Sequence, residues 1–189
     1  MRMNKFVKHI TLVLTLGLIV VGCTTATHLE HVEHVDNTHY NEIPESVLKN
    51  GTYVVDGQPV KLVNGIAENK IPGSASRTIT KYFGAALKLD MNGDGLLDSA
   101  FLLQQETGGS GTFFFVVAAI NSKSGYRATK ALFLGDRIVP QSMSIDPRDP
   151  RQFIVDYLTR RPGEPMATTP SVLVSKRIAL KNGALGEAK

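Results

Sequence analysis

The strongest constraint on the fold is an uninterrupted apolar run in the middle of the chain, Phe113 to Ile120. In a β-strand, successive side chains point to opposite faces of the sheet. A strand that is apolar at every position must therefore be covered on both faces, as the central strand of a sheet is. The run predicts a sheet with other layers packed above and below it.

The rest of the second half also has a β texture, with turn residues between most apolar segments. Upstream, the pairs Asp56-Gly57 and Asn64-Gly65 supply the positive φ angles that tight hairpins need, which predicts a small meander over residues 52–68. Pro59 places its strand at an edge. Further strands are predicted over residues 78–89, 99–105, 112–120, 128–134, 137–145, 152–158 and 171–180.

One short helix is predicted at the start of this region, where Pro44 to Lys49 precedes the helix-ending pair Asn50-Gly51. No long amphipathic helix pattern occurs elsewhere in the sequence. The predicted fold is therefore mainly β, an antiparallel curved sheet or β-sandwich with one short N-terminal helix.

The N-terminus has the layout of an export signal. Three basic residues, Arg2, Lys5 and Lys8, precede an apolar run from Ile10 to Val21. That run is shorter than the roughly 20 residues of a membrane-spanning helix. A permanent spanning helix is not expected.

The end of the run, Val20-Val21-Gly22-Cys23, resembles the lipobox of bacterial lipoprotein precursors. The resemblance implies that Cys23 becomes the mature N-terminus and carries a diacylglycerol on its sulfur and an acyl chain on its amine. Several chains anchor a protein far better than one does. The alternative is that Cys23 is only a small residue near an ordinary cleavage site. Because Thr24 is not aspartate, the resemblance implies the periplasmic face of the outer membrane in a Gram-negative host.

These features divide the chain into a signal peptide (1–22), a lipidated His-rich tether (23–43) and a single β-rich domain (44–189). The signal contains three of the 21 basic residues and none of the 17 acidic ones, so the mature chain has a net charge of +1. Nothing then indicates a nucleic-acid partner, which would call for a basic surface stripe.

The tether contains a three-residue repeat with histidines at positions 28, 31 and 34. On a helix these imidazoles would form a slanting stripe, and neighbouring ones could share a Zn²⁺, Cu²⁺ or Ni²⁺ ion. The alternative interpretation is a polar spacer that gains charge as the pH falls towards 6.

The clearest motif in the domain is a D-x-N-x-D-G-x-x-D loop from Asp90 to Asp98. Oxygen atoms at alternate positions of a tight loop converge on one point, which suits a hard cation such as Ca²⁺. The predicted ligands are the side chains of Asp90, Asn92, Asp94 and Asp98 and the carbonyl of Leu96.

This loop resembles the first nine positions of an EF-hand, and equally the calcium loops of propeller-type repeats. It departs from the EF-hand at position twelve, where Phe101 cannot supply a carboxylate, and in its strand-like flanks. The prediction is a structural calcium ion that pins a β-turn, and the alternative is an ion-free turn bonded through its own side chains.

Catalytic motifs are weak. The segment Gly108 to Thr112 lacks the last glycine of a nucleophile elbow and leads into a strand. Ser46 to Lys49 matches S-x-x-K without the partner motifs of penicillin-recognising enzymes. All five histidines precede residue 42, so acid–base chemistry in the domain would rest on carboxylates.

Residues 73–175 also resemble a domain of proteobacterial lipoproteins and periplasmic proteins, a likeness that implies no activity. The matching segments are 73–76, 90–98, 109–114, 134–138, 162–166 and 170–172. The sequence thus predicts a cell-envelope binding or structural module with a calcium-stabilised loop and an envelope protein as possible partner. The alternatives are an envelope-polymer hydrolase and a metal-handling protein that uses the tether.

Overall fold

The computed structural model describes residues 42–71 and 73–188. This part of the chain forms twelve strands and one short helix, and all of its sheets are antiparallel. The prediction of a mainly β, antiparallel fold with one short helix is confirmed. The signal peptide, Cys23 and the histidine repeat lie outside the described residues.

The elements, in chain order, are α1 (Glu45–Leu48), β1 (Thr52–Val55), β2 (Gln58–Lys61), β3 (Ile66–Lys70), β4 (Arg77–Leu89), β5 (Asp98–Glu106), β6 (Thr112–Ser122), β7 (Gly125–Ala128), β8 (Leu132–Asp136), β9 (Val139–Ile145), β10 (Phe153–Thr159), β11 (Val172–Lys181) and β12 (Ala184–Glu187).

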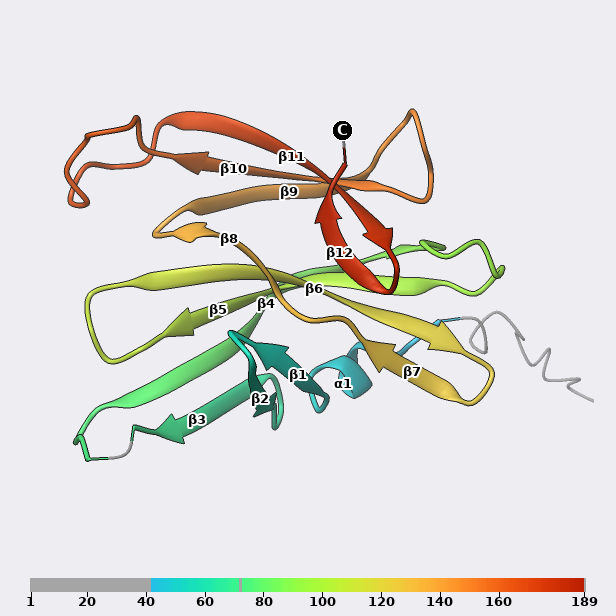
Figure 1. Cartoon of the computed structure of the whole chain (residues 1–189), viewed down its shortest axis with the longest axis horizontal. Helices are drawn as coiled ribbons and strands as arrows, with labels where there is room; N and C mark the ends of the chain where they lie inside the picture. Colours follow the sequence, from blue (N-terminus) through green and yellow to red (C-terminus); the bar gives the residue numbers. More distant parts are fainter. Residues whose placement is uncertain (1–41, 72, 189) are drawn as a thin grey trace, which may run out of the picture. The chain divides into compact units, whose positions relative to one another are not determined.

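The strands form three sheets (Figure 1). The largest has the order β3-β4-β5-β6-β7, and β8 also pairs with β6. A four-stranded sheet, β12-β11-β10-β9, packs against one face of the large sheet, and the β1–β2 hairpin and α1 pack against the other. The large sheet is therefore the middle layer of three.

Alternate residues of β6 lie in two separate hydrophobic cores. One set faces the four-stranded sheet and the other faces the β1–β2 hairpin, as the two-sided apolar run predicts. The first set is Phe114, Val116, Ala118 and Ile120, and the second is Phe115, Val117 and Ala119. All seven are buried, which confirms that this strand is covered on both faces.

Strand β5 divides its side chains in the same way. Ala100 and Leu102 belong to the first core, and Phe101 and Leu103 to the second. The Phe101 ring stacks on Tyr82, with ring centroids 4.8 Å apart. Two adjacent strands thus separate the two cores along the centre of the molecule.

Three two-residue turns have positive φ at both central positions, as type I′ hairpins require. They are Asp56-Gly57 (47° and 77°), Asn64-Gly65 (51° and 86°) and Asn182-Gly183 (51° and 77°). The last of these turns joins β11 to β12. Strand β12 was not predicted, although the Asn182-Gly183 pair that precedes it is a hairpin signal.

One predicted strand and one predicted meander are wrong. The strand predicted over residues 128–134 is two strands, because β7 and β8 pair with successive parts of β6 and the chain leaves the sheet between them. The meander predicted over residues 52–68 also breaks, since β3 pairs with β4 in the large sheet. Val63, which follows β2, forms an isolated bridge with Ile66 at the start of β3.

The packed domain begins before Pro44. Ile43 is 5% exposed and belongs to the second core, and Glu42 forms a parallel bridge with Leu97. Lys88 donates hydrogen bonds to the Ile43 carbonyl and to Ser99 Oγ. These contacts hold residues 42–43 on the sheet rather than in the tether.

Leu103 tests the second core, because its side chain is fully buried between β5 and the hairpin layer. We expect Leu103→Ala to lower the free energy of unfolding by about 2–5 kcal/mol, since it removes buried methyl groups and leaves a cavity. Urea denaturation measures the change. The control is Leu173→Ala, whose side chain is 62% exposed and which should change stability by about 0.5 kcal/mol or less. Equal effects would contradict this core assignment.

Candidate functional site

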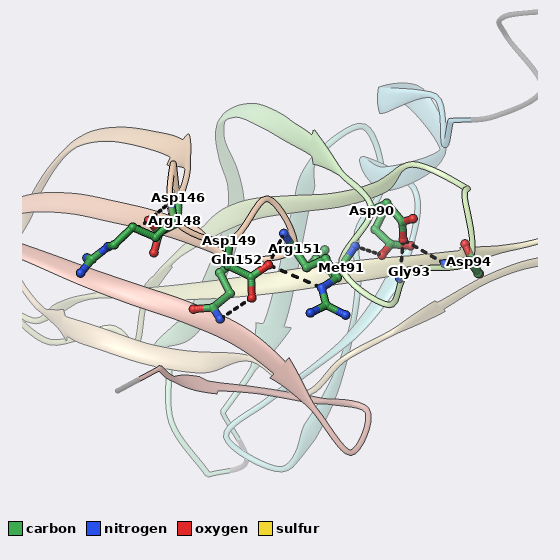
Figure 2. Close-up of polar contacts among 10 residues, drawn as sticks. Asp90, Met91, Gly93, Asp94, Asp146, Arg148, Asp149, Arg151 and Gln152 are labelled. Atoms are coloured by element: carbon green, nitrogen blue, oxygen red, sulfur yellow. Dashed lines mark hydrogen bonds and ion pairs between the residues drawn. The ribbon is translucent and has the colours of Figure 1, made fainter.

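The Asp90–Asp98 segment connects β4 to β5 and is folded around one carboxylate. Asp90 Oδ1 accepts hydrogen bonds from the backbone N–H groups of Gly93 (2.7 Å) and Asp94 (3.2 Å), and Oδ2 accepts one from Gly95 (2.8 Å; Figure 2). Gly93 and Gly95 have φ angles of 80° and 84°, which a glycine adopts without strain. Asp90 therefore fixes the tight turn.

Asn92 and Asp94 stabilise the second half of the loop. Asn92 Oδ1 accepts from the Asp94 N–H (3.0 Å), and Asn92 Nδ2 donates to Asp94 Oδ2 (2.9 Å). Asp94 Oδ1 accepts from the Leu96 N–H (2.9 Å). The bond from Leu96 and the bond from the Asn92 amide lower the pKa of Asp94, so this exposed carboxylate remains ionised.

Asp98 differs from the other acids because it is fully buried. Its Oδ2 accepts from the Met91 N–H (2.9 Å) and its Oδ1 from the Asn121 N–H (2.8 Å). Burial raises the pKa of Asp98, and its two backbone hydrogen bonds oppose that shift. The carboxylate ties the start of the loop to the end of β6.

The predicted ligands are thus only partly brought together. Asp90, Asn92 and Asp94 form one hydrogen-bonded turn, whereas both Asp98 oxygens are engaged by backbone N–H groups of Met91 and Asn121. Leu96, whose carbonyl was predicted as a ligand, contacts the loop by donating its N–H to Asp94 Oδ1. Across residues 42–71 and 73–188, no group of three His, Cys, Asp or Glu side chains is placed to hold a metal ion. The calcium ion remains a prediction.

A second acidic turn, Asp146 to Gln152, connects β9 to β10 beside this loop (Figure 2). Asp149 accepts hydrogen bonds from the Arg151 N–H (3.0 Å) and from Gln152 Nε2 (2.8 Å), and the Arg151 bond is the main cause of its lowered pKa. Asp146 is buried and forms an ion pair with Arg177. Sequence reasoning treated this segment only as a break between strands.

The signal that could have identified the second turn is the repeated triplet Asp-Pro-Arg at residues 146–148 and 149–151. Each aspartate accepts a hydrogen bond from the backbone N–H two residues later, which is an Asx-turn. The repeat is therefore structural in origin. What the sequence did not reveal is that this turn lies against the Asp90–Asp98 loop, where a β-carbon on Gly93 would lie 4.0 Å from Arg151 Cδ.

Two polar hollows flank the Asp90–Asp98 loop, and Asn92 lines both of them. The first, about 430 Å³, lies between this loop, the second acidic turn and the β11–β12 turn. The second, about 410 Å³, lies between this loop and the β6–β7 hairpin. The first includes Met91, Asp149, Arg151, Lys181 and Asn182, and the second includes Asp94, Ser122, Ser124, Tyr126 and Arg127.

A smaller and more apolar hollow, about 290 Å³, lies between the bulged part of β4 and the edge strand β9. Pairing of β4 with β5 shifts register between Phe83 and Leu87.

On β9, the Gln141 amide donates to the carbonyls of Val139 and Pro140 (3.0 and 3.3 Å). Side chains that cover edge carbonyls in this way reduce unwanted strand pairing.

Lys88 and Ser99 form a base–hydroxyl contact that sequence reasoning missed. Lys88 Nζ lies 3.0 Å from Ser99 Oγ, and burial lowers the pKa of Lys88, although Glu42 and Glu45 oppose that shift. A nucleophilic serine needs access to substrate, whereas Ser99 is fully buried. The pair therefore holds residues 42–43 in place.

Comparisons with protein-family models, with curated proteins and with solved structures find no match to this chain. Within the described ranges, none of the helical structure is long and apolar enough to cross a membrane. Functional inference therefore rests on the residues of the chain itself.

Asp98→Asn tests the link between the loop and β6. An amide offers one oxygen where the carboxylate offers two, so either the Met91 or the Asn121 N–H would face an NH₂ group. Because hydrogen bonds to charged groups contribute roughly 1.5–3 kcal/mol, we expect a loss of about that size in the free energy of unfolding. The matched control, Asp94→Asn, changes an exposed carboxylate and should cost less.

The pH dependence of unfolding gives a second measurement. Because the pKa of Asp98 is raised in the native state, the folded protein binds a proton at Asp98 more readily than the unfolded chain does. The contribution of Asp98 to the free energy of unfolding should therefore fall as the pH rises above about 3.9. The lowered pKa of Asp94 acts in the opposite direction, and its contribution should be lost as the pH falls below about 3.9. If Asp98→Asn leaves both stability and its pH dependence unchanged, this role of Asp98 is wrong.

Proposed function

We propose that this chain is a lipid-anchored protein of the bacterial cell envelope whose β-domain serves as a binding or structural module. The observation that carries the proposal is the N-terminal order of three basic residues, a short apolar run and Val20-Val21-Gly22-Cys23. Each part has a physical role in export, cleavage or attachment. In a Gram-negative host, Thr24 favours the periplasmic face of the outer membrane.

The domain supports a binding role through the placement of its polar loops. The Asp90–Asp98 loop, the Asp146–Gln152 turn and the β11–β12 turn line one hollow at the ends of well-packed strands. Binding residues are often carried on loops that a rigid scaffold positions. An envelope protein is a candidate partner for such a surface.

The alternative of an envelope-polymer hydrolase has less support. The domain contains no histidine and no cysteine after residue 41, so a hydrolase would depend on paired carboxylates. Among the acids of the described loops, Asp90 and Asp98 are engaged by backbone N–H groups and Asp149 is paired with Arg151. A metal-handling role would depend on the histidine repeat of the tether.

We also propose that the Asp90–Asp98 loop binds a calcium ion that stabilises the fold. The oxygens of Asp90, Asn92 and Asp94 lie at alternate positions of one tight turn, and Asp94 is exposed and ionised. Asp90 Oδ1 accepts two hydrogen bonds, but Asp90 Oδ2, Asn92 Oδ1 and both Asp94 oxygens accept one each, which leaves each of these four oxygens a lone pair for a cation. Calcium accepts irregular geometry and six to eight oxygens, including waters.

The Cys23→Ala substitution tests the anchor. We expect the wild-type protein to partition with membranes and to have an intact mass above that of the Cys23–Lys189 polypeptide by the attached lipid. The variant should lack the lipid mass and remain uncleaved at this site. The measurements are mass spectrometry and membrane fractionation, with Thr24→Ala as the neighbouring control that keeps the thiol. A mature wild-type protein with a free Cys23 would refute the anchor.

Thermal unfolding with and without metal tests the loop. At a calcium concentration of a hundred times Kd, binding to the native state adds about 2.7 kcal/mol. For a domain of this size that corresponds to a rise in Tm of about 5–10 °C. Chelation should remove the rise, and magnesium should restore less of it than calcium does, because Mg²⁺ requires a stricter octahedron.

The matched variants are Asp94→Ala, which should abolish the calcium response, and Glu68→Ala, which removes an exposed acid outside the loop and should preserve it. Each variant is measured under both conditions, because removing one of several repelling carboxylates can stabilise an ion-free loop. If metal-free wild type, verified by elemental analysis, has the same Tm with and without millimolar calcium, the loop is an ion-free turn.

A further inference from the structure

The two polar hollows beside Asn92 form a nearly continuous rim. Asn92 lines both, and Arg127 of the second hollow reaches across to Gly183 of the first, with Nη1 3.4 Å from the Gly183 carbonyl. Each hollow falls within the roughly 300–1,000 Å³ of small-ligand sites. A ligand longer than one ring could contact both of them.

The walls of the second hollow contain both hydrogen-bond acceptors and donors. The Asp94 carboxylate accepts, and the exposed Arg127 guanidinium donates. The Ser122 hydroxyl donates its proton to the Gly125 carbonyl and can accept from a ligand, whereas the Ser124 hydroxyl, 3.3 Å from it, can donate or accept. On the far side of Asn92, the first hollow adds the Arg151 guanidinium and the Asn182 amide.

This mixture indicates the chemistry of the ligand. The calcium ion proposed for this loop would use only acceptors, and a simple anion would use only donors, so neither accounts for the donors that line the same hollow. Each Asp94 oxygen accepts one hydrogen bond within the loop, so the carboxylate can accept from a ligand hydroxyl whether or not the ion is bound. Groups that both donate and accept, such as hydroxyl and acetamido groups, match a wall that offers both donors and acceptors. Tyr126 adds a half-buried aromatic ring to this hollow, while its hydroxyl is directed towards Gly51 and the Tyr53 hydroxyl in the second core.

The rim is held in shape by the backbone. Asp98 ties the loop to β6 through Met91 and Asn121. The Ser122 hydroxyl donates to the Gly125 carbonyl across the β6–β7 turn (2.8 Å). Binding would therefore immobilise few additional side chains or loops. The smaller loss of conformational entropy favours affinity.

We propose that the paired hollows on either side of Asn92 bind an envelope glycan through its hydroxyl and acetamido groups. This deepens the proposed function, because it depends on the envelope location for its ligand class. Arg127 donates to ligand oxygens, Asp94 accepts from ligand hydroxyls, and Asn92 contacts the glycan at the junction of the two hollows.

Calorimetric titration of the full-length lipoprotein in detergent with tetra-N-acetylchitotetraose tests the proposal. We expect saturable binding, with the Kd raised at least tenfold by Arg127→Gln and by Asn92→Ala. Arg127 is an exposed side chain, so its variant keeps the fold even if Asn92→Ala disturbs the loop, and circular dichroism verifies both. The control is Arg161→Gln, which follows the opposite end of β10 from the Asp146–Gln152 turn and should leave the Kd unchanged.

Absence of saturable binding by wild type, or a Kd unchanged in the folded Arg127→Gln protein, overturns the glycan site. The mass of the Cys23 lipid separates this outcome from failure of the proposed function. A lipidated protein that does not bind the glycan disproves only the site, whereas an unlipidated protein that binds it disproves only the anchor.

Discussion

The structure depends on the burial of the central strand β6 on both of its faces. Because every position from Phe114 to Ile120 is buried, the large sheet cannot exist as an exposed layer and needs a partner on each side. The four-stranded sheet covers one face, and the β1–β2 hairpin with α1 covers the other. This arrangement explains why so short a helix and so small a hairpin persist, since each is stabilised by packing on a core and neither is long enough to be stable alone.

The same scaffold ties one of its loops to the central strand. Asp98 begins β5, and its buried carboxylate bonds to Met91 on one side and Asn121 on the other. A charge placed in a protein interior is unfavourable unless hydrogen bonds compensate it, and here the two backbone donors offset part of the cost of burial. These two bonds connect the Asp90–Asp98 loop to the end of β6, next to the β6–β7 hairpin. A binding surface formed from these two segments would be largely preformed, whether its ligand is an ion, a glycan or a protein.

The sequence allowed much of this fold to be predicted, where local physics decides it. The apolar run Phe113 to Ile120 identified the central strand, and the Asp56-Gly57 and Asn64-Gly65 pairs identified their turns. Pairing between distant segments was not predictable in the same way, because the β2–β3 turn suggested a hairpin whereas β3 pairs with β4. For the candidate site, the Asp90–Asp98 loop was recognised from its spacing. Its neighbour, Asp146 to Gln152, was not, since nothing in either segment encodes their proximity.

The bridge between Glu42 and Leu97 has a consequence for reach. The chain enters the folded domain beside the Asp90–Asp98 loop, because Leu97 belongs to that loop. The 19 residues from Cys23 to Asn41 can span at most about 60–70 Å when fully extended. With lipid on Cys23, as proposed, the tether would join the domain next to the candidate site and would limit how far the site can lie from the membrane. The two polar hollows would then stay within a limited distance of the bilayer surface. Changing the number of residues between Cys23 and Glu42 would change that distance without altering the domain.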